Sequence, residues 1–132
     1  MGTWGTGAFD SDDSLDWVWA LLESRDWSVV GSTLRTAADV EPDAYLEAPD
    51  GQVAWAAAAV VAAAGNPGVT LPDEVSAWLD DHRASCPAEL RPLAALALER
   101  VLADRSELAE LWDEAGNDAW RTDVRSLASQ LG

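Results

Sequence analysis

Lysine and isoleucine are absent from the 132-residue sequence, and Cys, Met, Phe, Tyr and His occur once each. The single Cys86 excludes an intramolecular disulfide. No basic residue precedes Arg25, so the positively charged start of a secretory signal is lacking as well. These absences together predict a cytoplasmic protein, because reduced thiols are typical of that compartment.

Positive charge is scarce. The basic residues are eight arginines, against 24 Asp and Glu, and the formal net charge is −16. Such a surface repels phosphate backbones and anionic lipids, so neither nucleic acid nor a membrane is an expected partner. The hydrophobic content of 48% is too high for a disordered acidic tail. Basic proteins, cations or simple solubility remain as reasons for the charge.

No apolar run is long enough to cross a bilayer. The longest, residues 53–64, has twelve residues. As a helix it would be about 18 Å long, whereas the hydrocarbon core of a bilayer is about 30 Å thick. This run is therefore predicted to be a buried helix.

The pattern of apolar residues is helical throughout. No segment alternates with period two, and apolar residues recur at helical spacing instead. The sequence predicts an all-α fold, with residues 1–132 forming one domain. We expect a bundle of six or seven helices around two mostly apolar central helices, residues 52–64 and 93–102.

Capping residues, prolines and a glycine predict where the other helices begin and end. We expect the first at residues 13–24, capped by Asp10 or Asp12, and the second at residues 27–38. The apolar arc of the first helix contains Leu15, Val18, Trp19, Leu21 and Leu22. Pro72 opens the fourth helix, and either Pro87 or Pro92 opens the next. A capping box of Asp104 and Glu107 starts the following helix, Gly116 ends it, and Asn117 caps the last.

The N-terminal stretch WGTGAFDSDDSLDW is unlike generic bundle sequence. It resembles the opening of the bacterial domain of unknown function 4259 family. Four later stretches are similar to the same family: YLEAPDG, LPDEVSAWL, LRPLAALALERVL and SELAELWDEAG. The resemblance covers nearly the whole chain, and it implies no activity and no catalytic residues.

Two aromatic residues enclose two glycines in this N-terminal motif. Gly5 and Gly7 permit backbone conformations that a side chain would forbid, and Trp4 and Phe9 lie beside them. We expect the two aromatic side chains to anchor residues 1–12 against the bundle as a packed loop.

Four carboxylates then crowd the junction of loop and helix: Asp10, Asp12, Asp13 and Asp16. One hypothesis is a Ca²⁺ or Mg²⁺ site, because these cations bind carboxylate oxygens, although the spacing is not that of an EF-hand. The other is that one Asp caps the helix while the rest interact with the positive end of its dipole. The sequence leaves both hypotheses open.

Residues for catalysis are few. His82 lies on an apolar helix face, and Cys86 follows four positions later. On a continuous helix the two side chains would meet, but Pro87 disfavours helical backbone at Cys86. The sequence predicts no catalytic site and no cofactor, and favours a protein that is not an enzyme.

Charge and tryptophan together suggest a binding function. Residues 1–50 carry 11 acids and 2 Arg, hence −9, against −7 for residues 51–132. Trp17 lies at the margin of the first helix's apolar arc, where it either packs against a neighbouring loop or is half exposed. Exposed tryptophans are enriched at binding hot spots. We expect a non-enzymatic interaction module, an inhibitor or immunity-type partner of a basic protein, with Asp10, Asp12, Asp13, Asp16 and Trp17 as binding residues. The alternative is a metal-binding module or metal-dependent enzyme built on the aspartates.

Overall fold

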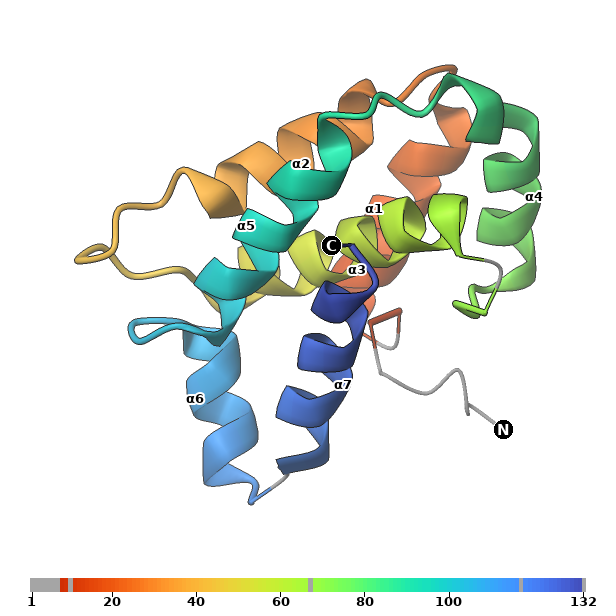
Figure 1. The fold of residues 1–132 in the computed structure, drawn as a ribbon. Coiled ribbons are helices and arrows are strands. Elements are labelled where there is room, and N and C mark those ends of the chain that lie inside the picture. The colour runs from red at the N-terminus through yellow and green to blue at the C-terminus, as the bar shows by residue number, and fades with distance from the viewer. Residues whose placement is uncertain (1–7, 10, 67, 117, 132) are drawn as a thin grey trace.

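The fold is a bundle of helices (Figure 1). The computed structural model describes residues 8–9, 11–66, 68–116 and 118–131, and 72% of this part is helical. Its elements are α1 (Asp12–Glu23), α2 (Ser28–Ala38), α3 (Ala48–Gly65), α4 (Asp73–His82), the 3₁₀ turn η1 (Arg83–Ser85), α5 (Leu90–Leu102), α6 (Glu107–Glu114) and α7 (Asp118–Ser129). The described residues contain no strand, only one bridge between Leu46 and Ser106. The all-α prediction is confirmed.

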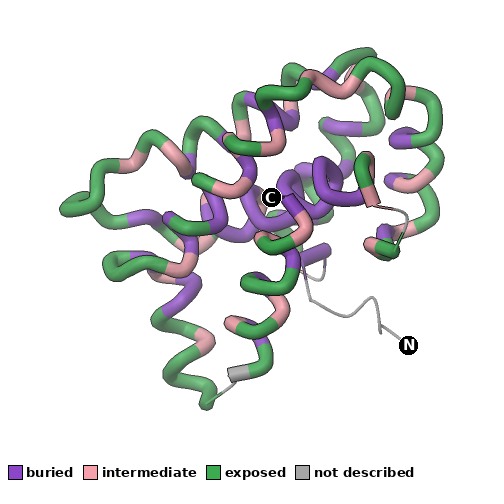
Figure 2. Tube along the Cα trace, in the orientation of Figure 1, coloured by how far each residue is buried: buried purple, intermediate pink, exposed green. Residues whose placement is uncertain are grey.

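Helix α3 is the centre of the bundle, as its uniformly apolar sequence predicts. Twelve of its 18 residues are buried, seven of them alanines, and Figure 2 shows this buried segment in the middle of the molecule. Small side chains let neighbouring helices approach closely, and α1, α2, α4, α5, α6 and α7 all contact α3. The hydrophobic core forms around it.

Helix α5 is the second central element and packs against α2, α3, α6 and α7. It begins at Leu90, so Pro92 is its third residue. An N–H at this position has no partner within the helix, which is why proline neither kinks nor breaks α5. Its outer side reaches solvent, since Leu96 is 55% exposed.

The start of α1 differs from both predicted caps. The cap is Ser11, whose hydroxyl oxygen accepts a hydrogen bond from the backbone N–H of Ser14 at 3.1 Å. The prediction of Asp12 as cap is wrong, because Asp12 is already helical; Asp10 lies outside the described residues. The carboxylates of Asp12 and Asp13 lie in the first turn, where the helix dipole favours negative charge.

The predicted capping box of Asp104 and Glu107 is also wrong. Ser106 caps α6, and its hydroxyl accepts from the N–H of Ala109. The carboxylate of Glu107 instead accepts from the N–H of Ala48 at 2.8 Å. This contact caps α3, which starts four residues earlier than predicted with Pro49 in its first turn. The chain pairs Leu46 with residues 105 and 107, and that pairing brings the two helix starts together.

A buried arginine holds the connections beside these helix starts. Arg100 is 8% exposed, and its guanidinium donates to backbone carbonyl oxygens on two loops. The acceptors are Val40, Glu41, Ala44, Asp104 and Arg105. Gly116, at φ 71°, ends the α6 segment as predicted, and the predicted cap Asn117 lies outside the described residues.

Candidate surface site on the first helix

The outward side of α1 is an exposed apolar face. Trp19 is 69% exposed, Leu15 49% and Leu22 36%. The side of α1 that faces the core holds Ser14, Trp17, Val18 and Leu21. The predicted apolar arc is therefore wrong for three of its five members. Helix α1 has one apolar face toward the core and a second toward solvent, and the predicted arc combined residues of both.

Trp17, predicted to be a binding residue at the margin of the arc, is buried at 7% exposure. Its indole N–H donates to the hydroxyl oxygen of Thr33 on α2 at 2.8 Å, which satisfies the polar atom. Trp17 therefore contributes to the packing of α1 on α2, and Trp19 is the indole that α1 presents to solvent. The apolar pattern could not indicate this, because the buried side of α1 includes the polar residue Ser14.

The buried hydrogen bond of Ser14 explains why this side of α1 faces the core. Its hydroxyl donates to the carbonyl oxygen of Ala8 at 2.7 Å, and the side-chain amide of Gln52 donates to the same oxygen at 3.0 Å. Ala8 and Phe9 are buried. The packing of the whole N-terminal loop stays a prediction, because Trp4, Gly5 and Gly7 lie outside the described residues.

Carboxylates border one side of the exposed face. At about 100° per residue, Asp12, Glu23 and Asp16 lie about 20°, 40° and 60° to one side of Trp19. Leu15 and Leu22 lie about 40° and 60° to the other side. All five side chains are exposed. The face therefore has an apolar edge, an indole in the middle and an acidic edge.

The aspartates do not form a ligand cage in the part of the chain that the structure describes. There, no three His, Cys, Asp or Glu side chains are grouped closely enough to hold a metal ion. Asp12, Asp13 and Asp16 are exposed along α1. Asp10, the fourth residue of the predicted set, lies outside the described residues.

His82 and Cys86 have separate surroundings. The Nδ1 atom of His82 lies 2.7 Å from the carbonyl oxygen of Trp78, and the imidazole stacks on that indole with 4.2 Å between ring centroids. Cys86 has extended backbone, as expected before Pro87, and burial raises the pKa of its thiol. A raised pKa disfavours the thiolate that nucleophilic catalysis needs.

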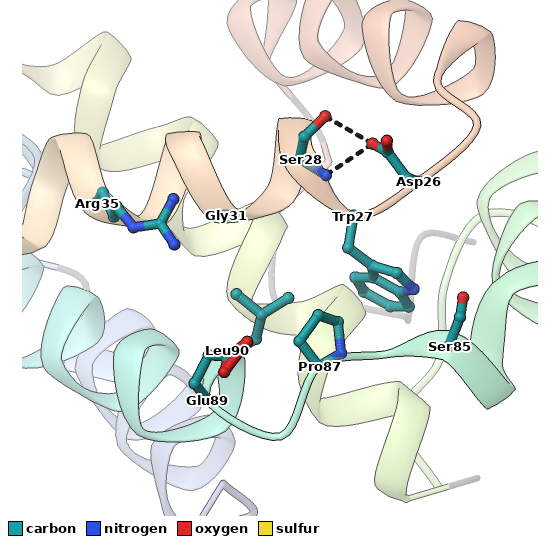
Figure 3. Close-up of a pocket in the computed structure, with 9 residues that line it drawn as sticks. All are labelled: Asp26, Trp27, Ser28, Gly31, Arg35, Ser85, Pro87, Glu89 and Leu90. Atoms are coloured by element: carbon teal, nitrogen blue, oxygen red, sulfur yellow. Dashed lines mark hydrogen bonds between the residues drawn. The ribbon is translucent and has the colours of Figure 1, made fainter.

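A groove of about 400 Å³ lies between the starts of α2 and α5 (Figure 3). Its charged side chains are Asp26, Arg35 and Glu89, and its wall includes Trp27. Asp26 accepts two hydrogen bonds from Ser28, which lower the pKa of its carboxyl. The indole N–H of Trp27 and the hydroxyl of Ser85 both donate to the carbonyl oxygen of His82. Asp26, Trp27, Ser28 and Ser85 are thus engaged in local structure, and the lining holds no nucleophile paired with a base.

The family model described as domain of unknown function (DUF4259) matches residues 2–123. The chain belongs to this family. The match includes α1 with its exposed face and extends into α7. No curated protein and no solved structure matches the chain. Family membership confirms the resemblance of the N-terminal motif and assigns no activity.

No helix in the described part of this DUF4259 member is both long enough and apolar enough to span a bilayer. The twelve-residue apolar run is the interior of α3, in contact with other helices on all sides.

Proposed function

We propose that this DUF4259 protein is a non-enzymatic interaction module of the cytoplasm, an inhibitor or immunity-type partner that binds a basic protein through α1. One observation carries the proposal: Trp19 is 69% exposed, between two exposed leucines. Single exposed apolar residues are ordinary, but a cluster with an indole at its centre is typical of a binding surface.

The other large apolar side chains that are exposed in the described part of the chain belong to three different elements. Tyr45, Leu96 and Leu111 are on a loop, α5 and α6 respectively. Among the residues that the structure describes, three such side chains follow one another at helical spacing only on α1. This concentration favours α1 as the docking element.

Charge indicates the kind of partner. The α1 face has Asp12, Asp16 and Glu23 along one edge, and residues 1–50 carry −9. An acidic edge around an apolar centre attracts basic proteins and accelerates their association. A partner with a basic, partly apolar surface fits both features.

The test begins with capture from the cells that produce the protein, followed by purification of the captured partner. Calorimetry then measures its affinity for the wild-type chain and for a variant with Asp12→Arg, Asp13→Arg and Asp16→Arg. A matched variant carries Asp39→Arg, Glu41→Arg and Asp43→Arg in the exposed loop after α2, on the opposite side of Figure 1 from α1. Both variants change the net charge by the same amount.

The α1 variant should lose binding while the loop variant keeps it. Affinity for the wild type should fall steeply between about 50 and about 300 mM salt, because exposed charges are screened. The α1 variant should melt at a lower temperature yet stay folded, since positive charge at a helix start opposes the dipole. Equal binding by both variants, or capture of no basic protein, would contradict the proposal.

Titration with calcium and magnesium tests the metal alternative on the same proteins. We expect no binding to the wild type at micromolar concentrations. Micromolar binding that disappears in the α1 variant would replace the interaction proposal with a metal site on the aspartates.

A further inference from the structure

Building on the proposed function, we infer that the α1 face is selective for arginine: the partner places a guanidinium over the indole of Trp19, with its N–H groups toward the carboxylates of Asp16 and Glu23. The binding element of the partner is then an arginine-bearing amphipathic segment. A segment that carries lysine at the same position would bind more weakly.

The two edges of the face fit the two parts of such a segment. Asp16 and Glu23 lie three residues before and four residues after Trp19, so each is a neighbour of the indole on the helix surface. On the other side of the indole, Leu15 lies four residues before Trp19 and Leu22 three residues after it. Apolar side chains of the partner would pack on the leucines, while its guanidinium would cover the indole and reach a carboxylate.

The protein already contains this arrangement within its own fold. The guanidinium carbon of Arg121 lies 5.8 Å from the ring centroid of Trp120. The same guanidinium donates from Nε to Oδ1 of Asp113 at 3.0 Å and from an Nη atom to Oδ2 at 2.8 Å. Indole, arginine and carboxylate thus combine here into one contact, and on α1 the indole and the carboxylates are present without the arginine.

The chemistry of the two basic side chains explains the selectivity. A guanidinium is planar, weakly hydrated and able to stack on an indole while it donates two parallel hydrogen bonds to a carboxylate. An ammonium group is a compact, strongly hydrated charge that cannot make both contacts in one plane. If net charge alone governed binding, arginine and lysine at this position would give the same affinity.

A second copy of this chain does not fit the face equally well. Two chains of net charge −16 repel each other, and α1 offers its partner an acidic edge. The occupant must therefore supply the positive charge.

The test uses two synthetic amphipathic helical peptides of equal length and charge, one with arginine and one with lysine on the polar face. Fluorescence anisotropy measures their affinity for the full-length protein. The arginine peptide should bind about tenfold more tightly, as expected for a partly desolvated cation–π contact. Trp19→Leu keeps an apolar side chain and should abolish the preference, whereas Trp19→Phe, which keeps an aromatic ring, should retain part of it.

Asp16→Asn with Glu23→Gln should also reduce the preference, and Asp39→Asn with Asp43→Asn in the loop after α2 is the matched control that should leave it unchanged. Equal affinity for the two peptides, or an arginine preference that survives Trp19→Leu, would overturn the inference.

Self-association of the chain through Trp19, measured by sedimentation, would also overturn it. Equal but salt-sensitive binding of both peptides would leave the proposed function standing, whereas retained binding of the purified partner by the α1 variant would refute that function itself.

Discussion

Trp17 and Trp19 show how a separation of two residues changes the role of an indole. On a helix they point about 160° apart. Trp17 is 7% exposed and bonded to Thr33, while Trp19 is 69% exposed. The first residue holds α1 on α2, and the second is available to a partner.

This contrast predicts opposite effects of truncation on folding. Trp17→Ala should lower the free energy of unfolding by about 3–5 kcal/mol, because it removes a large buried side chain and leaves a cavity. Trp19→Ala should change it by no more than about 0.5 kcal/mol, as is usual for exposed positions. Urea denaturation followed by circular dichroism measures both. A larger loss for Trp19→Ala than for Trp17→Ala would mean that the two indoles have been assigned the wrong roles.

Tyr45 gives a second prediction for a single residue. Its hydroxyl donates to a carboxylate oxygen of Glu110 at 2.8 Å, and this hydrogen bond raises the pKa of Tyr45 from 10.0 to about 12. The bond exists only with the neutral phenol, so its contribution to stability is complete below pH 10.0 and is lost as the pH rises toward about 12.

Ultraviolet titration of tyrosinate measures this pKa without ambiguity, because the chain has one tyrosine. Glu110→Ala should return the pKa toward 10.0. If the wild type already titrates at the ordinary value, the contact between Tyr45 and Glu110 does not persist in solution.

Among the elements, the loop between α2 and α3 depends on one side chain from α5. Arg100 supplies donors to the carbonyl oxygens of Val40, Glu41 and Ala44. These bonds tie the backbone of this mostly exposed loop to α5.

Arg100→Met keeps much of the side-chain length and removes every donor. We expect it to lower the free energy of unfolding by about 3 kcal/mol, the range for buried groups that lose a charged hydrogen-bond partner. Hydrogen exchange at residues 39–47 should accelerate at the same time. Arg125→Met, at an exposed arginine of α7, is the control and should leave stability and exchange unchanged. Unchanged exchange in the Arg100 variant would show that the loop is held by other contacts.

The sequence predicts the elements well where one kind of signal dominates. Residues 53–64 are apolar on every side, and the structure places them inside the central helix. Helix starts are less predictable, because the decisive contacts come from distant residues. Glu107, expected to cap its own helix, caps α3 instead, and no local pattern around residue 48 reveals that contact.

The exposed face of α1 illustrates the same limit for the candidate site. Of the two tryptophans of α1, the sequence favours Trp17 as the binding residue, whereas the structure buries Trp17 and exposes Trp19. Leu15, Val18, Leu21 and Leu22 are apolar, yet two of them face the core and two face solvent. The orientation of α1 depends on Ser14, whose hydroxyl is bonded to the Ala8 carbonyl and therefore lies inside. A pattern that assigns serine to the surface cannot find this arrangement.

Charge acts on the molecule as a whole. With a net charge of −16, the folded state brings many carboxylates closer together than the unfolded chain does. The exposed aspartates of α1 add to this repulsion locally, a cost that a basic partner would relieve.

Added salt should therefore stabilise the protein. We expect the melting temperature to rise by about 4 °C, equivalent to about 1 kcal/mol for a chain of this length, between about 10 and about 300 mM salt, as the repulsion between carboxylates is screened. Sodium and potassium chloride should act equally, since the effect depends on ionic strength. A melting temperature that falls with salt would show that attractive ion pairs outweigh the repulsion.

The indole N–H signals of the eight tryptophans provide the decisive observation on binding. Their nuclear magnetic resonance spectrum is recorded on the ¹⁵N-labelled chain while the purified basic partner is added, with Trp19→Phe used to assign the signal of Trp19. We predict that the Trp19 signal shifts or broadens first and most, and that the signal of Trp17, buried two residues away, stays in place. A bound partner that leaves the Trp19 signal unchanged would contradict the assignment of α1 as the docking surface.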